Sequence, residues 1–291
     1  MLELDWRQRQ ALAAGGALLL CLGVGTALAD QADGQAALAG EARRSMTLAL
    51  PAALEGVEVT EARLPGRPLV VIDPGHGGND PGASGVSGTV KEKALTLLLA
   101  QELRDRLAAR GRVRVALTRN GDTSVPLETR AAIARALGAD LFLSIHADSA
   151  SNPLARGATV YSLSEVASDA DAARLAAAQN GQLQSAGAAD GSVRALLADL
   201  AVRDEMRGSA DFAVRLLGKA AGRVELRPEP HRFAAFRVLR GAEAPAVLFE
   251  AGYLSNAEDE AMLKNPAQRT RLVGALAQAI EAEMALTRTS R

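Results

Sequence analysis

The stretch from Val70 to Ala83 reads VVIDPGHGGNDPGA. It begins with β-branched residues that are typical of a buried strand and continues into a Gly- and Pro-rich loop that carries His76. A second apolar run, LFLSIH, ends at His146, so two of the three histidines stand at the ends of expected strands. Loops that leave the carboxyl ends of strands line the binding crevice of an open α/β sheet. The pattern therefore favours an α/β fold with a site at that edge of the sheet.

Strands and helices alternate along the chain after Pro68. The expected strands are 69–73, 113–118, 141–146 and 158–163, and the expected helices are 91–110 and 127–137. Such alternation predicts βαβ units, so we expect a mostly parallel or mixed sheet of about six strands flanked by helices.

A mostly helical stretch at about 165–222 precedes the last expected strands, 233–239 and 246–249, and a closing helix at 266–286. A crossover connection needs only about a dozen residues. We therefore expect 165–222 to contain an insertion, either packed on the sheet or acting as a regulatory lid.

Composition sets the broad class of the protein. With 291 residues, 48% hydrophobic and 23% charged, the chain can bury a full core. The formal net charge of −1 provides no overall field for binding nucleic acid, so we expect no nucleic-acid partner.

The first 29 residues have the pattern of an export signal. Arg7 and Arg9 precede an uncharged stretch, 11–29, that ends in small residues at Ala27 and Ala29. We expect cleavage after Ala29, a periplasmic or otherwise extracytoplasmic mature protein, and no membrane contact after cleavage. The alternative is a retained single-span anchor, because the uncharged stretch 11–29 is nearly as long as the about 20 apolar residues that cross a bilayer.

The rest of the chain divides at Pro68. Residues 30–67 form a short tether with a possible edge strand at 57–64, and 68–287 form the catalytic domain. Cys21, the only cysteine, lies in the expected signal, which excludes disulfides and thiolate metal sites from the mature chain.

Three residues can form a metal site at the strand ends. Glu92 opens the helix after the His76 loop, where an acidic residue by itself would only complement the helix dipole. The Gly-rich loop can fold back, however, and bring His76 and Glu92 together with His146. Three protein ligands with an open fourth position are typical of catalytic zinc.

Glu250 is a further candidate, because it follows the apolar run 246–249 and precedes the loop at Gly252. A carboxylate at such a place is costly unless it has a partner or a task. It can take a proton from water that a metal has activated and pass it to a leaving amine.

At this point the motifs match a known family. From about Pro68 to Ala285 the chain resembles the zinc-dependent N-acetylmuramoyl-L-alanine amidases of the cell-division type. The shared motifs are DPGHGG-D-G at 73–82, Glu92, SIHAD at 144–148 and EAGYLSN at 250–256, with Thr118, Arg119, Asp122, Leu127 and Arg130 between them.

The resemblance implies that His76, Glu92 and His146 bind one zinc ion per chain and that Glu250 is the general base and acid. It implies hydrolysis of the amide between the lactyl group of N-acetylmuramic acid and L-alanine of the stem peptide in peptidoglycan. The implied roles are cell wall remodelling and daughter-cell separation.

The resemblance also implies regulation. In such enzymes an inserted segment can block the zinc until an activator protein displaces it, and a glutamate can fill the open metal position. Glu165 is the candidate here, because it follows the strand that ends at Leu163. It is equally well explained as a solvated turn residue.

Several alternatives stay open from the residues. The chain could be a catalytically inert peptidoglycan-binding or scaffold protein, or a zinc peptidase that cuts within the stem peptide. His231 is expected in a surface loop. Arg119, Arg130 or Arg232 can contact carboxylates of the stem peptide, and nothing in the sequence selects among them.

Overall fold

A computed structural model describes residues 54, 56–181 and 193–289 of the chain, and within them side chains except those of 193–201 and 288–289. The expected signal, 1–29, and most of the expected tether lie outside the described residues. None of the helices in the described part is long and apolar enough to cross a membrane.

The sheet has seven strands in the order β1-β3-β2-β4-β7-β5-β6. Strands β3, β2, β4 and β7 are parallel to one another, whereas β1 is antiparallel to β3 and β5 is antiparallel to β7. This confirms the expected mixed sheet. The strands are β1 (Val59–Thr60), β2 (Leu69–Pro74), β3 (Arg114–Leu117), β4 (Leu141–His146), β5 (Ala158–Leu163), β6 (Leu226–Ala234) and β7 (Ala246–Glu250).

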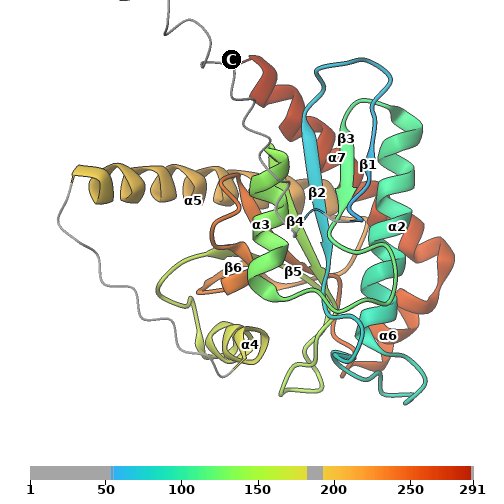
Figure 1. Ribbon diagram of the computed structural model, residues 1–291. Helices are drawn as coiled ribbons and strands as arrows, with labels where there is room; N and C mark the ends of the chain where they lie inside the picture. Colours follow the sequence, from blue (N-terminus) through green and yellow to red (C-terminus); the bar gives the residue numbers. More distant parts are fainter. Residues whose placement is uncertain (1–53, 55, 182–192, 290–291) are drawn as a thin grey trace, which may run out of the picture. The chain divides into compact units, whose positions relative to one another are not determined.

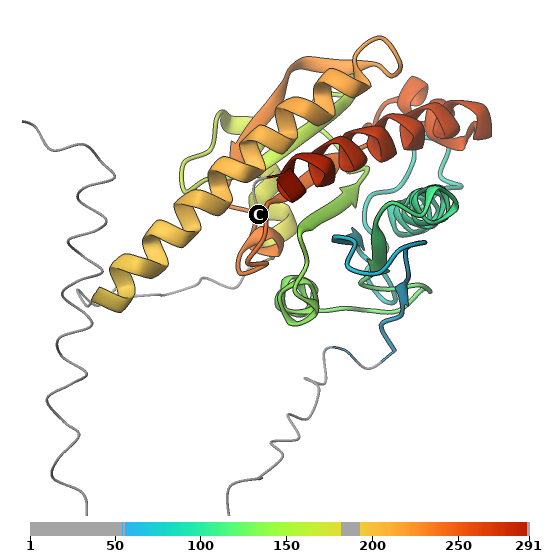
Figure 2. The same cartoon turned by 90° about the horizontal axis from the view of Figure 1, so that it is seen from above.

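Helices cover both faces of the sheet (Figures 1 and 2). One face packs against α2 (Glu92–Arg110), α5 (Val193–Ala220) and α7 (Pro266–Thr289). The other packs against α3 (Leu127–Leu137), α4 (Ala170–Asn180) and the short 3₁₀ helix η2 (Arg237–Leu239). A further helix, α6 (Ala257–Lys264), precedes α7.

The alternation of side chains along the strands places the functional residues on one face. In β4, Phe142 packs in the core cluster on the α3 and α4 side, and in β7 Leu248 does the same. Because side chains two and four positions further along a strand return to the same face, His146 and Glu250 point to this face at the carboxyl ends of the strands. The two residues are direct partners in the β4 and β7 pairing.

The insertion between β5 and β6 contains α4 and α5. In the later part of α5, Phe212, Ala213 and Leu216 are fully buried in the core cluster with α7 and the sheet. This part of the insertion is therefore packed on the sheet. The side chains of 193–201, at the start of α5, lie outside the described ones.

The expected strand near 233 was wrong in its bounds, whereas the expected closing helix is confirmed. The expected strand 233–239 begins at Leu226 as β6 and ends at Ala234, so His231 lies in a strand rather than in a loop. Pro228 and Pro230 argue against a strand in sequence reasoning, but β6 is the edge strand, where proline is tolerated. The closing helix expected at 266–286 is α7, which begins at Pro266 as expected, two residues after the end of the shorter helix α6.

Candidate functional site

His76, Glu92 and His146 come together at the carboxyl ends of β2 and β4. One ligand atom from each residue lies within 4.8 Å of those of the other two. His76 Nε2 is 3.0 Å from Glu92 Oε2, and His146 Nδ1 is 3.1 Å from Glu92 Oε1. The two imidazole rings are edge to face, with their centroids 5.0 Å apart.

Glu92 is held at the start of α2 by backbone donors. Its Oε2 accepts a hydrogen bond from the N–H of Ala83 at 2.8 Å, and its Oε1 accepts one from the N–H of Ala147 at 2.9 Å. Burial by itself would raise the pKa of Glu92, but hydrogen bonds and charge from His146 and His76 hold it well below its ordinary value. Glu92 is therefore an ionised carboxylate, which is the form that binds a cation.

The loop backbone explains the glycines around His76. A Cβ on Gly75 would come within 2.3 Å of the His146 ring, and one on Gly82 would come within 2.6 Å of Glu92 Oε2. His76 has a φ of 61°, a left-handed conformation that is uncommon outside glycine and that concentrates at functional sites.

The three residues fit a metal ion by their donor chemistry. The buried Nε2 of His76 has no hydrogen-bond partner among the described residues, although a carboxylate oxygen is 3.0 Å away. His76 Nδ1 is 2.8 Å from Asp80 Oδ2. A metal-binding histidine commonly donates its second ring N–H to a carboxylate in this way, which leaves the other nitrogen for the metal.

The two carboxylates around His76 favour its protonated form. Burial lowers the pKa of His76, but the carboxylates of Glu92 and Asp80 outweigh burial and raise it to about 9. A proton on His76 thus provides positive charge between the two carboxylates, and a metal ion would have to displace it.

Asp73 is fully buried and holds the start of the His76 loop through its hydrogen bonds. Its Oδ1 accepts from Thr118 Oγ1 at 2.5 Å and from Arg130 Nη1 at 2.8 Å, and its Oδ2 accepts from Ser144 Oγ at 2.7 Å. Burial would raise the pKa of Asp73, but Arg130 and the two hydroxyl groups lower it.

Arg119 and Arg130, which lie between the shared motifs, also support this loop. Arg119 donates to the carbonyls of Pro74 and Gly75, and Arg130 donates to those of Pro74 and His76, all at 2.8–3.0 Å. Both side chains are buried. Arg232 is paired with Asp169 at 2.8 Å. These three guanidinium groups are engaged in holding the fold, so they are poor candidates for contacts with a substrate carboxylate.

Glu250 is fully buried at the end of β7. Its Oε2 accepts from the N–H of Asp148 at 3.0 Å, while its Oε1 has no hydrogen-bond partner among the described residues. Burial and the negative charges of Asp148 and Glu92 raise the pKa of Glu250 well above its ordinary value. A carboxyl group whose pKa is raised in this way is suited to taking up and releasing a proton, as a general base or acid does.

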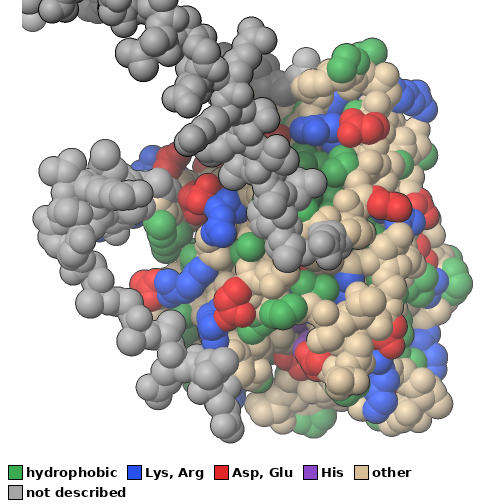
Figure 3. All heavy atoms as spheres, in the orientation of Figure 1, with side chains coloured by type: hydrophobic (Ala, Val, Ile, Leu, Met, Phe, Trp, Pro, Cys, Tyr) green, Lys and Arg blue, Asp and Glu red, His purple; other side chains and the backbone are tan. Residues whose placement is uncertain are grey.

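His76 and His146 line a hollow of about 400 Å³. Loop residues 125–127 form one wall, and the carboxyl end of α4, residues 178–181, forms another. Gln179 Nε2 donates to Asp148 Oδ2 at 3.0 Å across this wall. Figure 3 shows histidine and acidic side chains next to one another on this side of the molecule.

Two sequence candidates lie away from the metal group. Glu165 is 73% exposed and its Oε1 accepts from Arg240 Nη2 at 2.7 Å, so the structure does not bring it to His76. Its metal-blocking role stays a prediction. His231 contacts Ser162 Oγ at 2.9 Å and packs on Phe233, which makes it part of the packing of β6. Sequence reasoning missed Asp148 as the residue that holds Glu250 and Gln179 as the partner of Asp148, and only the SIHAD motif pointed to Asp148.

Comparisons with known proteins agree on one family. The Amidase_3 family model, described as N-acetylmuramoyl-L-alanine amidase, matches residues 70–282. The N-acetylmuramoyl-L-alanine amidase AmiA of Escherichia coli is 39% identical over 220 residues, which are 74% of this chain and 75% of that protein. The amidase AmiC of Neisseria meningitidis serogroup B is 33% identical over 74% of this chain and 52% of that protein. The structure of the amidase AmiC2 of Nostoc punctiforme is similar with a TM-score of 0.54 at 28% identity, and covers 78% of this chain and 99% of that one.

Proposed function

We infer the reaction from the family to which the chain belongs. This is the N-acetylmuramoyl-L-alanine amidase family. The reaction is hydrolysis of the amide between the lactyl group of N-acetylmuramic acid and L-alanine of the stem peptide in peptidoglycan. The observation that carries the residue roles is the convergence of His76, Glu92 and His146 next to the half-satisfied carboxylate of Glu250.

We propose that His76, Glu92 and His146 hold one zinc ion. When bound, zinc polarises the scissile carbonyl and lowers the pKa of water to about 7. The backbone N–H groups of Ala83 and Ala147 fix the Glu92 carboxylate, and Asp80 fixes the tautomer of His76. These contacts set the ligand geometry before the metal arrives.

Glu250 transfers the proton. Its Oε1 accepts a proton from the attacking water as the carbonyl carbon becomes tetrahedral. The same proton then passes to the amide nitrogen as the C–N bond breaks, so that the stem peptide leaves with a free L-alanine amine and the lactyl group keeps a carboxylate. The N–H of Asp148 keeps Oε2 in place and leaves Oε1 for this transfer.

We further propose that the chain is exported by its first 29 residues, acts outside the cytoplasm as the 68–287 domain, and serves daughter-cell separation. An activator protein that displaces the inserted segment fits the placement of α4, whose carboxyl end borders the hollow at His76 and His146. The contact from Gln179 to Asp148 ties that border to the residue that holds Glu250.

The test is mass spectrometry of products released from purified peptidoglycan by the chain from Asp30 onward, loaded with zinc. Glu250→Gln is the inactive variant, and Glu258→Gln is the matched control because Glu258 is 70% exposed and contacts Arg156. A second form, with 183–206 replaced by a flexible linker, tests for a blocking insertion.

Intact stem peptides with a free L-alanine amine support the amidase, and release only by the second form adds autoinhibition. Cut peptides still attached to muramic acid overturn the assignment in favour of a peptidase. No product from either folded, zinc-loaded form indicates an inert wall-binding protein or an obligatory activator.

A further inference from the structure

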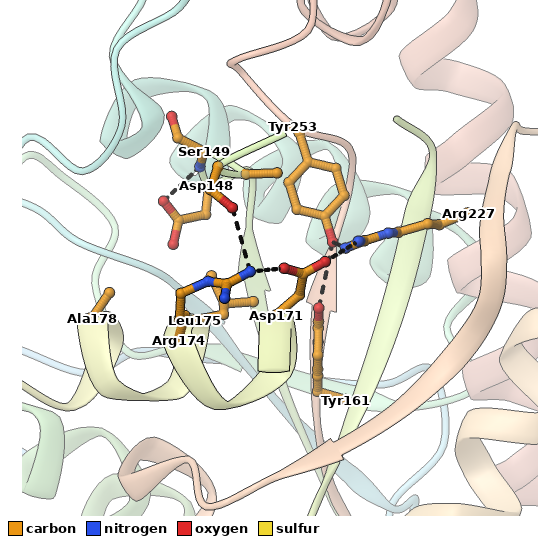
Figure 4. A pocket seen from close by; sticks show the side chains of 11 residues that line it. Asp148, Ser149, Tyr161, Asp171, Arg174, Leu175, Ala178, Arg227 and Tyr253 are labelled. Carbon is orange, nitrogen blue, oxygen red and sulfur yellow. Dashed lines mark hydrogen bonds and ion pairs between the residues drawn. The ribbon is translucent and has the colours of Figure 1, made fainter. Parts of the chain in front are cut away.

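A second cavity lies on the other side of Asp148 from the metal group. Its volume is about 190 Å³. Its lining comes from the loop after β4, from α4, from β5 and β6, and from the loop that carries Tyr253 (Figure 4). Asp148 and Ala178 line both this cavity and the hollow at His76, so the two spaces are neighbours.

Two arginines dominate the chemistry of this cavity. Arg227 is largely buried, with 11% of its side chain exposed, and donates to Asp171 Oδ2 at 2.8 Å and to Tyr253 Oη at 3.1 Å. Arg174, on α4, is 61% exposed and also contacts Asp171. The carboxylate of Asp171 is therefore shared by two guanidinium groups, while Asp148, the other acidic residue of the lining, accepts a hydrogen bond from Gln179.

Arg174 has donors to spare for a ligand. A guanidinium group has five N–H donors. Among the described residues, Arg174 contacts only Asp171 and, at 3.4 Å, the hydroxyl of Ser151. In Figure 4 its guanidinium group lies between Asp171 and the loop that follows β4. This is the arrangement of a forked donor that can bind a second carboxylate.

The position of Glu250 indicates that the stem peptide of the substrate extends toward this cavity. Asp148, which lines the cavity, donates its N–H to Glu250 Oε2, and Tyr253, which forms another wall, follows Glu250 by three residues. The group that protonates a leaving amine must lie within hydrogen-bond reach of it. The part of the substrate that leaves as an amine is the stem peptide, so the peptide extends on the Glu250 side.

We propose that Arg174, backed by Arg227, binds the carboxylate of the stem peptide nearest to the scissile bond and so selects peptides in which that carboxylate is free. The inference rests on the proposed amidase function. A volume of about 190 Å³ is smaller than the roughly 300–1,000 Å³ of sites for drug-sized ligands. The cavity therefore receives one residue of the peptide rather than the whole of it.

The test uses two muramyl peptides that differ only in whether the carboxylate of the second peptide residue is free or amidated. The quantity measured is the ratio of kcat/KM for the free form to that for the amidated form. The protein is the zinc-loaded chain from Asp30 onward, in whichever form of the insertion is active. The variants are Arg174→Gln, which removes the exposed guanidinium group, and Asp171→Asn, which removes the carboxylate that pairs with it. Arg271→Gln, on the exposed surface of α7, is the matched control.

We expect a ratio of about ten for the wild type and for Arg271→Gln, since a hydrogen-bonded charge contributes about a factor of ten or more. Arg174→Gln brings the ratio close to one, chiefly through KM, and Asp171→Asn raises it. A loss of folding or of metal would lower both rates together and leave the ratio in place. A wild-type ratio near one, or a ratio that Arg174→Gln does not change, overturns the proposal.

A binding measurement keeps this inference separate from the amidase assignment. If the wild type hydrolyses neither substrate, the proposed function fails. Calorimetric titration with L-alanyl peptides, free or amidated at the second residue, then tests the cavity directly. If the free peptide binds more tightly than the amidated one, and Arg174→Gln abolishes this difference, the result supports carboxylate binding in the cavity. Equal binding of the two peptides overturns it.

Discussion

The ends of β2 and β7 each present a carboxylate that is fully buried, on the same face of the same sheet, and the two behave in opposite ways. Asp73 has both oxygens occupied, by Thr118, Arg130 and Ser144. Glu250 has a single backbone donor and one oxygen with no partner among the described residues. The pKa of Asp73 is lowered and that of Glu250 is raised.

Hydrogen-bond partners and neighbouring charges, rather than residue type or burial, decide what a strand-end carboxylate does. Arg130 and two hydroxyl groups stabilise the charge of Asp73, so Asp73 is a fixed anion that holds the loop of His76. Glu250 faces two other carboxylates, Asp148 and Glu92, and is open to proton exchange. The structural and the chemical carboxylate can thus be distinguished before any rate is measured.

Glu250→Gln should abolish the proton transfer that distinguishes Glu250 from Asp73. Because Gln cannot take a proton from water, we expect release of stem peptides to fall by about a hundredfold to ten-thousandfold. The fold should be unharmed. A buried acid with a raised pKa destabilises the folded state at pH values above its unfolded pKa, so the neutral amide should raise the melting temperature slightly at pH 8. Product analysis and thermal unfolding measure the two effects. A stable variant with full activity would remove Glu250 from the reaction.

Asp73→Asn should have the opposite signature. The change leaves the guanidinium of Arg130 buried without its counter-charge, which should lower the free energy of unfolding by about 3–5 kcal/mol. Urea denaturation measures this loss. Asp105→Asn is a suitable control, because Asp105 is 68% exposed and pairs only with its neighbour Arg104 among the described residues. A loss no larger than that of the control would mean that the Asp73 network does not support the fold.

Zinc binding should depend on pH through His76. In the metal-free protein the raised pKa of about 9 means that protonated His76 stabilises the fold in full below its unfolded pKa of about 6.5. That stabilisation is lost as the pH rises through 9. Zinc must displace this proton, so its apparent affinity should rise by about tenfold per pH unit between 6.5 and 9.

Thermal unfolding with zinc and with a chelator, at pH 6.5 and at pH 9, measures this effect as a larger gain in melting temperature at the higher pH. His231→Gln is the matched control, because His231 lies on β6 away from the metal group. A zinc affinity that does not change over this pH range would contradict the role of the His76 proton.

Glu165 is an exposed carboxylate, in contrast to Asp73 and Glu250. We expect Glu165→Ala to have the smallest effect of these variants on stability and on hydrolysis. The pair of Glu165 with Arg240 is exposed, so its loss should change the free energy of unfolding by less than about 1 kcal/mol. Arg240→Gln removes the same pair and serves as the control. Glu165 does not line the hollow at His76, so we expect Glu165→Ala to leave hydrolysis in the absence of an activator unchanged. A rise in basal hydrolysis with Glu165→Ala alone would support its metal-blocking role.

Much of the fold could be predicted from local patterns. The expected helix 127–137 and the expected strands 141–146 and 158–163 coincide with α3, β4 and β5. The edge strand β6 could not be placed, because prolines that exclude a central strand are tolerated where one side of the strand has no neighbour. Likewise, Arg119 and Arg130 were candidate substrate contacts in the sequence, and only their burial showed that their donors are taken up by the loop carbonyls.

The sequence by itself determined which residues stand at strand ends, because the period of two along a strand and the glycines of the His76 loop are local properties. Only the tertiary structure decided what those residues do. Thr118 and Arg130 stand 45 and 57 positions away from Asp73, and Asp148 stands 102 positions away from Glu250. Charge and hydrogen bonding act over a few ångströms in space, whatever the distance along the chain, so the roles of the two carboxylates were settled when the sheet brought those partners together.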